Sequence, residues 1–170
     1  MESKDIILKL EKNGLVFESL FKNITEEQIS WKANENKWSM LEIVCHLLDE
    51  EKEDFRQRID FTLNNPGEAW PAIDPQGWVR SRNYSGKNFD ETLNQFLAER
   101  KKSIEWLYNL SNPNWQVCYL HPKAGEVSAE QLLANWIAHD LLHIRQITAT
   151  NYAYLLYKTS PIKLDYAGKW

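Results

Sequence analysis

Cysteine is scarce in this chain, and so are the patterns that indicate a secreted or membrane-bound protein. Cys45 and Cys118 are the only two cysteines in 170 residues, a content typical of a reducing cytosol that provides no disulfide framework. No apolar run approaches the roughly 18 residues of a membrane-spanning helix. The N-terminal segment carries charges among its apolar positions and therefore lacks the apolar core of a signal peptide. We expect a cytoplasmic protein with no membrane partner.

Positive charge is not in excess either. Lysine and arginine total 20 residues against 24 acidic residues, which gives a formal net charge of −4. A nucleic-acid surface needs clustered cations, and the short basic run Arg100–Lys102 lies within a helical pattern, where it is typical of a solvated face. Also absent are a Gly-rich phosphate loop, a CxxC pair and the Ser-His-Asp order of common hydrolases. These absences exclude nucleic acid as the expected partner and leave phosphoryl and hydride transfer without support.

What the sequence does contain is helical periodicity. Apolar residues make up 43% of the chain, and in four segments they recur at steps of three and four, which predicts amphipathic helices. The four predicted helices cover about residues 3–23, 39–63, 89–110 and 128–150. Ser39 with Glu42, and Ser128 with Gln131, are capping-box pairs at the starts of the second and fourth helices. We therefore predict an all-α protein in one domain, residues 1–170.

The connection between the second and third predicted helices is long. Residues 65–88 carry three prolines and three glycines without a convincing period, and structureless connections beyond ~12–15 residues are uncommon. A helix of 20 residues spans about 30 Å, a length that this connection can cross. The second and third helices can then run parallel, which gives a four-helix bundle of up-down-down-up order with a long crossover. Elsewhere only residues 115–120 are compatible with extended chain, and a short helix is expected before Pro161.

Two of the four histidines form the pair His139-x-x-x-His143 in the fourth predicted helix. Residues four apart on a helix are ~5–6 Å apart at their Cβ atoms, so both imidazoles can place a nitrogen ~2.1 Å from one metal ion. The pair alone is weak evidence, because two ordinary histidines bordering a core have the same spacing. A metal site needs a further ligand from another helix.

His46 is the candidate for that further ligand. It lies seven residues past Ser39, or roughly 10 Å into the second helix, and His143 lies a similar distance before Thr150 in the fourth. If these two helices are antiparallel neighbours, the three histidines come to the same level. However, His46 falls outside the main apolar stripe of its helix, beside Glu42 and Asp49. A His46 side chain that faces water is therefore an open alternative.

Around these histidines the chain resembles a known family. The segments Trp38–Glu51 and Ala138–Ile147, which contain all three, resemble the DinB-like four-helix bundles, also called damage-inducible or metal-dependent hydrolase-like proteins. Weaker similarity extends over Trp78–Tyr84, Phe96–Arg100 and His121–Ser128. The likeness covers most of the chain and keeps the family order, although the tail after Tyr152 departs from it.

The resemblance implies a function as well as a fold. It implies an up-down-down-up bundle and one divalent metal ion, zinc or nickel, bound by His46, His139 and His143. Relatives include thiol S-transferases that use low-molecular-weight thiols, a thiol-dependent isomerase and proposed hydrolases. Dimers are frequent among them, so a homodimer is one expected state.

Three protein nitrogens would leave open positions on the ion, where water or a thiol becomes a nucleophile. We therefore expect a metal-dependent thiol S-transferase or hydrolase acting on a small molecule. The alternatives are a non-enzymatic, stress-associated metal- or ligand-binding bundle and a helical interaction module that binds no metal. Asp140 and Glu50 are candidates to accept a hydrogen bond from a ligating histidine, and His121, in a Pro/Gly loop, is interpreted as a surface residue. Candidates to line a substrate cleft are Trp38, Trp78 and Trp136, although packing in the core or a loop is the default for tryptophan.

Overall fold

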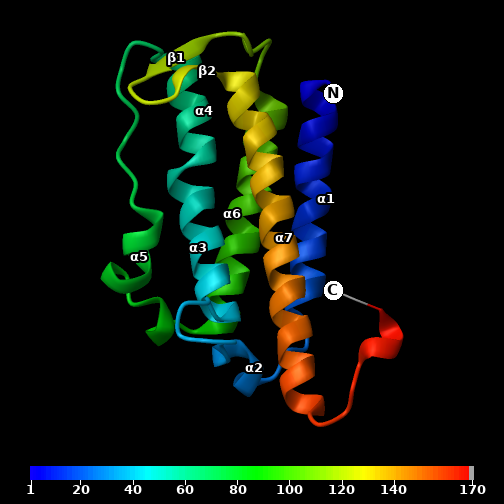
Figure 1. Ribbon diagram of the computed structural model, residues 1–170. Helices are drawn as coiled ribbons and strands as arrows, with labels where there is room; N and C mark the ends of the chain where they lie inside the picture. The colour runs from blue at the N-terminus through cyan, green and yellow to red at the C-terminus, as the bar shows by residue number, and fades with distance from the viewer. Residues whose placement is uncertain (169–170) are drawn as a thin grey trace.

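Four long helical segments make up most of the structure, a computed structural model that describes residues 1–168 (Figure 1). The bundle consists of α1 (Ser3–Phe21), the consecutive α3 (Met40–Glu53) and α4 (Phe55–Asn64), α6 (Phe89–Asn109) and α7 (Ala129–Thr159). The shorter elements are α2 (Glu26–Ser30), α5 (Pro75–Ser81), the 3-10 turns η1 (Tyr84–Gly86) and η2 (Asp165–Ala167), and the strands β1 (Cys118–His121) and β2 (Gly125–Ser128). The structure confirms the predicted all-α four-helix bundle.

The predicted helix starts are set by side-chain caps. Ser39 Oγ accepts a hydrogen bond from the Glu42 N–H at 3.2 Å, and Glu42 Oε2 accepts one from the Ser39 N–H at 2.9 Å. This complete capping box satisfies two backbone donors at the start of α3. At the start of α7, Ser128 Oγ accepts from the Gln131 N–H at 3.0 Å. Both helices therefore begin where the sequence predicted.

The second predicted helix is divided in two. Asp54 has φ −114° and ψ −98°, which is not helical, and the chain changes from α3 to α4 at this residue. Its N–H still donates to the Glu50 carbonyl at 3.0 Å, and its carbonyl accepts from the Arg58 N–H at 2.8 Å. The prediction of one continuous helix over residues 39–63 was wrong at this point, because the apolar period continues across the break and neither proline nor glycine marks it.

The long connection is partly ordered as α5 and η1. Asp74 caps α5 by accepting a hydrogen bond from the Gly77 N–H at 3.0 Å, and Pro75 occupies the first turn, where its missing N–H has no cost. Trp78 of α5 is buried in the core cluster that includes the apolar residues of α3. Arg82, which ends α5, is bonded to Asp49 and Glu53 on the polar side of α3, so the long connection covers the side for which the sequence left exposure to water open.

Two further departures from the predicted elements are local. β1 and β2 pair antiparallel, with Cys118 opposite Ser128, so the extended segment near residues 115–120 is half of a small hairpin. α7, predicted to run to about Thr150 or beyond, continues to Thr159, so the helix expected before Pro161 is the end of α7 and not a separate element. Although α7 is 31 residues long, neither it nor another helix within residues 1–168 is long and apolar enough to cross a membrane.

α3 and α4 run in the same direction as α6. Glu51 of α3 is bonded to Arg100 of α6, and Arg56 of α4 is bonded further along to Ser103. Since later residues pair with later residues, the two segments are parallel. The connection from the end of α4 to the start of α6 contains α5 and runs along the outside of the bundle (Figure 1).

α7 runs in the opposite direction beside α3 and α4. The rings of His46 and His143 lie 4.8 Å apart, whereas Phe55 stacks on Trp136, which comes earlier in α7. Since later residues of one segment pair with earlier residues of the other, the segments are antiparallel. This is the arrangement that brings the three histidines to one level.

A charged group lies in the centre of the bundle. The guanidinium of Arg100 donates two hydrogen bonds to Glu51 and two to Asp140, at 2.7–3.0 Å, and one to the Leu10 carbonyl at 3.2 Å. These residues come from α6, α3, α7 and α1 respectively. One arginine therefore ties together all four sides of the bundle, and its partner Asp140 directly follows His139 in the chain.

Candidate metal centre

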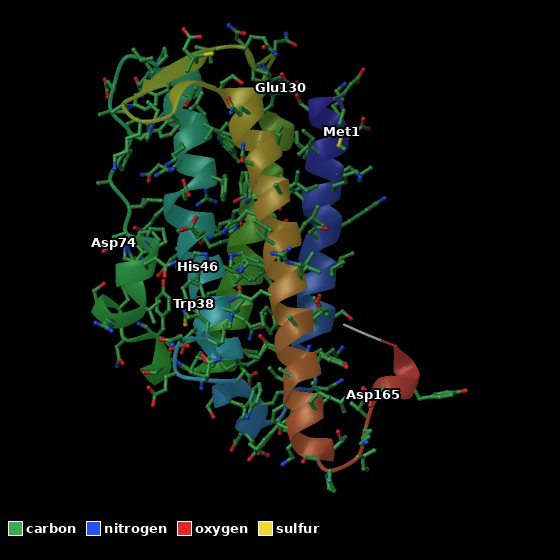
Figure 2. All side chains as sticks on the ribbon, in the orientation of Figure 1. Met1, Trp38, His46, Asp74, Glu130 and Asp165 are labelled. Carbon is green, nitrogen blue, oxygen red and sulfur yellow. The ribbon has the colours of Figure 1, made fainter. Side chains whose placement is uncertain are left out.

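Three histidine side chains from two helices converge. His46 Nε2 lies 3.4 Å from His139 Nε2, which lies 3.0 Å from His143 Nε2. All three possible ligand atoms are within 4.8 Å of one another. Figure 2 shows His46 on α3 at the level of the middle of α7. The antiparallel packing of α3 and α7 thus produces a cluster of three imidazoles.

The spacing of the nitrogens matches that of ligands on one metal ion. Two nitrogens that are each ~2.05 Å from an ion are about 3.4 Å apart in a tetrahedral arrangement and about 2.9 Å apart at a right angle. The observed separations of 3.0 and 3.4 Å lie at these two values. Two of the three nitrogen pairs thus have the spacing of ligands on one ion, and all three nitrogens lie within 4.8 Å of one another. Imidazole nitrogens suit a divalent ion such as zinc or nickel.

Burial keeps the three imidazoles neutral. His46 is 5% exposed and His143 is 8% exposed. Removal from water, together with the smaller effect of the neighbouring imidazole rings, lowers the pKa of His46 to about 3 and that of His139 to about 2. Burial also lowers the pKa of His143. Each ring therefore has a free lone pair at neutral pH, the form that binds a cation.

A glutamine orients one of the rings. His143 Nδ1 lies 2.8 Å from Gln146 Oε1, and since the amide oxygen accepts, Nδ1 carries the hydrogen and Nε2 has the lone pair. A hydrogen bond of this kind fixes the ring and tautomer of a ligating histidine. The sequence interpretation missed Gln146, although its position three residues after His143 places it on the same helix face. His46 Nδ1 is buried without a partner in the described part of the chain.

The two carboxylates that the sequence proposed as histidine partners lie elsewhere. Asp140 is bonded to Arg100 and to the Asn13 side chain. Glu50 is buried, and desolvation together with a hydrogen bond to Asp54 raises its pKa to about 9. Within residues 1–168, no hydrogen bond joins Asp140 or Glu50 to a histidine. Their predicted role as acceptors for a ligating histidine is therefore not observed.

Aromatic rings form walls on two sides of the cluster. The Trp38 ring lies 4.9 Å from that of His46, and the Phe55 ring lies 5.2 Å from that of His139. Trp38 comes directly before the cap of α3, and Phe55 begins α4. Of the proposed cleft residues, Trp38 therefore contacts the cluster.

The other two tryptophans are packed in the interior. Trp136 is 1% exposed and stacks on Phe55, with ring centroids 5.8 Å apart. Trp78 is 7% exposed and lies under the guanidinium of Arg82, 4.1 Å from its ring centroid. Trp136 thus packs behind Phe55, which contacts the cluster, and Trp78 holds α5 against the core.

His121 is separate from the cluster. Its Nδ1 accepts hydrogen bonds from the backbone N–H groups of Lys123 and Ala124 at 3.2 and 3.0 Å, and its ring lies 5.6 Å from that of Trp70. These bonds hold the tight turn between β1 and β2. The observed role of His121 is to shape the hairpin.

The cluster opens into a depression of about 380 Å³. Its lining consists of Asn36, Lys37, Trp38, His46, Gln76, His143 and Gln146. Two of the three clustered histidines are among these residues, so a small molecule in the depression reaches the imidazole nitrogens directly. The arrangement is that of a ligand site at the edge of a metal-binding cluster.

Comparison with known proteins agrees with this geometry. The sequence model of the DinB superfamily matches residues 9–147. Among solved structures, the chain is similar to YfiT from Bacillus subtilis, which is described as a probable metal-dependent hydrolase with an unusual four-helix bundle topology. The two superpose with a TM-score of 0.78 at 18% sequence identity, over 89% of this chain and 86% of YfiT. No curated protein matches the chain. Because the family match spans most of the sequence, this chain belongs to the DinB superfamily.

Proposed function

We propose that this protein is a metal-dependent enzyme, a hydrolase or a thiol S-transferase, acting on a small molecule. The observation that carries the proposal is the convergence of three neutral imidazole nitrogens at the edge of an open depression. A divalent ion, zinc or nickel, bound by His46, His139 and His143 would act as a Lewis acid that acidifies a coordinated water or thiol, giving a nucleophile at neutral pH.

The remaining residues prepare this site without reacting themselves. Gln146 holds His143 in the tautomer whose Nε2 can bind a cation. Trp38 and Phe55 shield two sides of the cluster from water, which strengthens electrostatic interactions inside it. A site with three protein ligands keeps a position for substrate, unlike a closed structural site with four. The description of YfiT as a probable metal-dependent hydrolase supports the same chemistry.

Metal analysis tests the first half of the proposal. We expect about one zinc or nickel ion per chain in the purified protein, measured by inductively coupled plasma mass spectrometry, and a loss of that ion in His46→Ala. His121→Ala is the matched control, because it removes the one histidine outside the cluster. A wild-type protein that binds no divalent ion, or a loss equal in both variants, would reject the site.

Turnover tests the second half. The metal-loaded protein is incubated with a panel of esters and amides, and separately with low-molecular-weight thiols and an electrophilic acceptor. Release of the hydrolysis product or consumption of thiol should exceed the rate of the His46→Ala variant by at least about 100-fold, since loss of the ion removes the nucleophile. Equal rates in the two proteins across both panels would leave a metal-binding bundle without the proposed activity.

A further inference from the structure

The lining of the depression has a one-sided charge. Lys37 is its charged side chain, and the polar neighbours Asn36, Gln76 and Gln146 are neutral amides. No carboxylate lines it, although acidic residues outnumber basic ones in the chain as a whole. The depression beside the histidine cluster is therefore poorer in negative charge than the chain as a whole.

Lys37 has no ion-pair partner within residues 1–168. Lys32, five residues earlier, is paired with Glu42 at 2.6 Å. Both lysines line an adjoining hollow of about 530 Å³ that shares Asn36, Lys37, Trp38 and Gln76 with the depression. Arg80 and the exposed Glu35 also line that hollow. Of the two lysines, Lys37 is thus the one with its ammonium group free to meet a ligand.

The histidine cluster adds to the positive field. Three neutral imidazoles leave the charge of a divalent ion uncompensated, unlike carboxylate ligands. Two groups of buried charges include carboxylates on the same helices as the histidines. Arg100, Glu51 and Asp140 together supply a single negative charge. The charge of buried Glu42 is compensated by Lys32. With Lys37 included, the depression keeps an excess of positive charge, and an excess of this sign favours an anionic ligand.

We propose that the substrate is a small organic anion, with a carboxylate that pairs with Lys37 while its reacting group reaches the histidine cluster. This inference rests on the proposed function and adds the class of substrate. The amides of Asn36 and Gln76 can donate further hydrogen bonds to the carboxylate, and Trp38 forms the apolar wall between its two ends. Lys37 is in this proposal a specificity-determining residue.

The test uses the full-length protein loaded with cobalt(II), whose thiolate complexes absorb in the near ultraviolet. The probes are 4-mercaptobutyrate and 6-mercaptohexanoate, each compared with its primary amide, which has the same shape and no charge. For at least one chain length, the acid should bind the wild-type protein about fivefold more tightly than the amide, the upper range for a partly exposed ion pair. Sodium chloride should reduce this preference.

Lys37→Met should abolish the preference for the acid while leaving the affinity for the amide unchanged. Lys123→Met, which removes one lysine from the hairpin, is the control for net charge and should keep the preference. Equal affinities for acid and amide in the wild type at both lengths would overturn the inference, as would a preference that persists in Lys37→Met. A wild-type protein that takes up no cobalt would instead reject the metal site, and the inference with it, before any probe is added.

Discussion

Arg100→Met removes the cation from a buried group that contains two carboxylates. The side chain of Arg100 is 4% exposed, that of Glu51 is 1% exposed and that of Asp140 is 0% exposed. In the variant both carboxylates would remain inside the bundle, where water cannot replace the four hydrogen bonds that the guanidinium donates to them. Methionine fills a similar volume, so the change is mainly one of charge.

We expect a loss of about 3–5 kcal/mol in the free energy of unfolding, the cost of leaving one side of a buried ion pair without its partner. In a domain of this size each kcal/mol lowers the Tm by about 2–4 °C, so the Tm should fall by roughly 6–20 °C. Burial without a cation also raises the pKa of a carboxyl group above its unfolded value. The folded variant then binds more protons than the unfolded chain, so its deficit should shrink as the pH falls from 7 to 5.

The measurement is urea and thermal unfolding followed by circular dichroism, on metal-free protein, because a bound ion would add its own stabilisation. Arg82→Met is the matched control: Arg82 also bonds Glu53 through two nitrogens, but its side chain is 30% exposed, so we expect a loss of at most about 1 kcal/mol. A triple variant that combines Arg100→Met with Glu51→Gln and Asp140→Asn should recover part of the loss, because it leaves no uncompensated charge.

Two results would refute this reasoning. One is a loss in Arg100→Met no larger than that in Arg82→Met, which would mean that burial does not matter for these pairs. The other is a triple variant that unfolds more easily than Arg100→Met at pH 7, which would mean that the hydrogen bonds, and not the unpaired charges, dominate the energy.

Three further predictions follow from the side chains near the cluster. Glu50→Gln should stabilise the metal-free protein increasingly from pH 5 to pH 8 in urea unfolding, by up to about 1.4 kcal/mol per pH unit: since burial raises the pKa of Glu50 to about 9, the folded wild type holds a proton that the unfolded chain releases. Gln146→Leu should weaken metal binding about 10- to 100-fold in competition with a chromophoric chelator, because His143 loses its hydrogen-bond acceptor. Burial raises the pKa of the Cys45 thiol to about 12, so the native protein should titrate only the exposed Cys118 with a thiol reagent, and both thiols after unfolding.

Each of these has a clear contrary result. A difference between Glu50→Gln and wild type that stays constant from pH 5 to pH 8 would show that the carboxyl group is ionised in the fold. Unchanged metal affinity in Gln146→Leu would show that the hydrogen bond does not orient the ring. Rapid reaction of two thiols per native chain would show that Cys45 is accessible.

The elements that the sequence predicted correctly are those determined by local chemistry. The starts of α3 and α7 follow from Ser39 and Ser128, whose side chains bond backbone groups three residues away. The break at Asp54 has no such signal, because the residue adopts its conformation between two segments that pack separately against α6 and α7. The direction of α6 relative to α3 likewise depends on pairs such as Glu51 with Arg100, 49 residues apart, which no periodicity contains.

The histidine cluster was predictable in part for the same reason. The spacing of His139 and His143 is local. Placing His46 at their level requires in addition that the second and fourth helices are antiparallel neighbours, a condition that the sequence alone does not establish. Gln146 was not identified, because a glutamine at this position has many other possible roles. For Trp136 and Trp78 the sequence left both a cleft position and the usual core packing of tryptophan open, because a ring beside a cleft and a ring beneath it have the same neighbours in the chain.

The one sequence argument against the site was the position of His46 among acidic residues, and its failure has a physical cause. A polar stripe indicates solvent only if its charges have no partners inside the protein. In α3, Glu42 is bonded to Lys32 and to its own cap, and Glu51 is bonded to Arg100. Both carboxylates are therefore buried with their charges compensated, and α5 covers what would have been the solvent side. The acidic residues around His46 thus mark a helix side that other elements cover, where an imidazole can be kept neutral and directed at a cation.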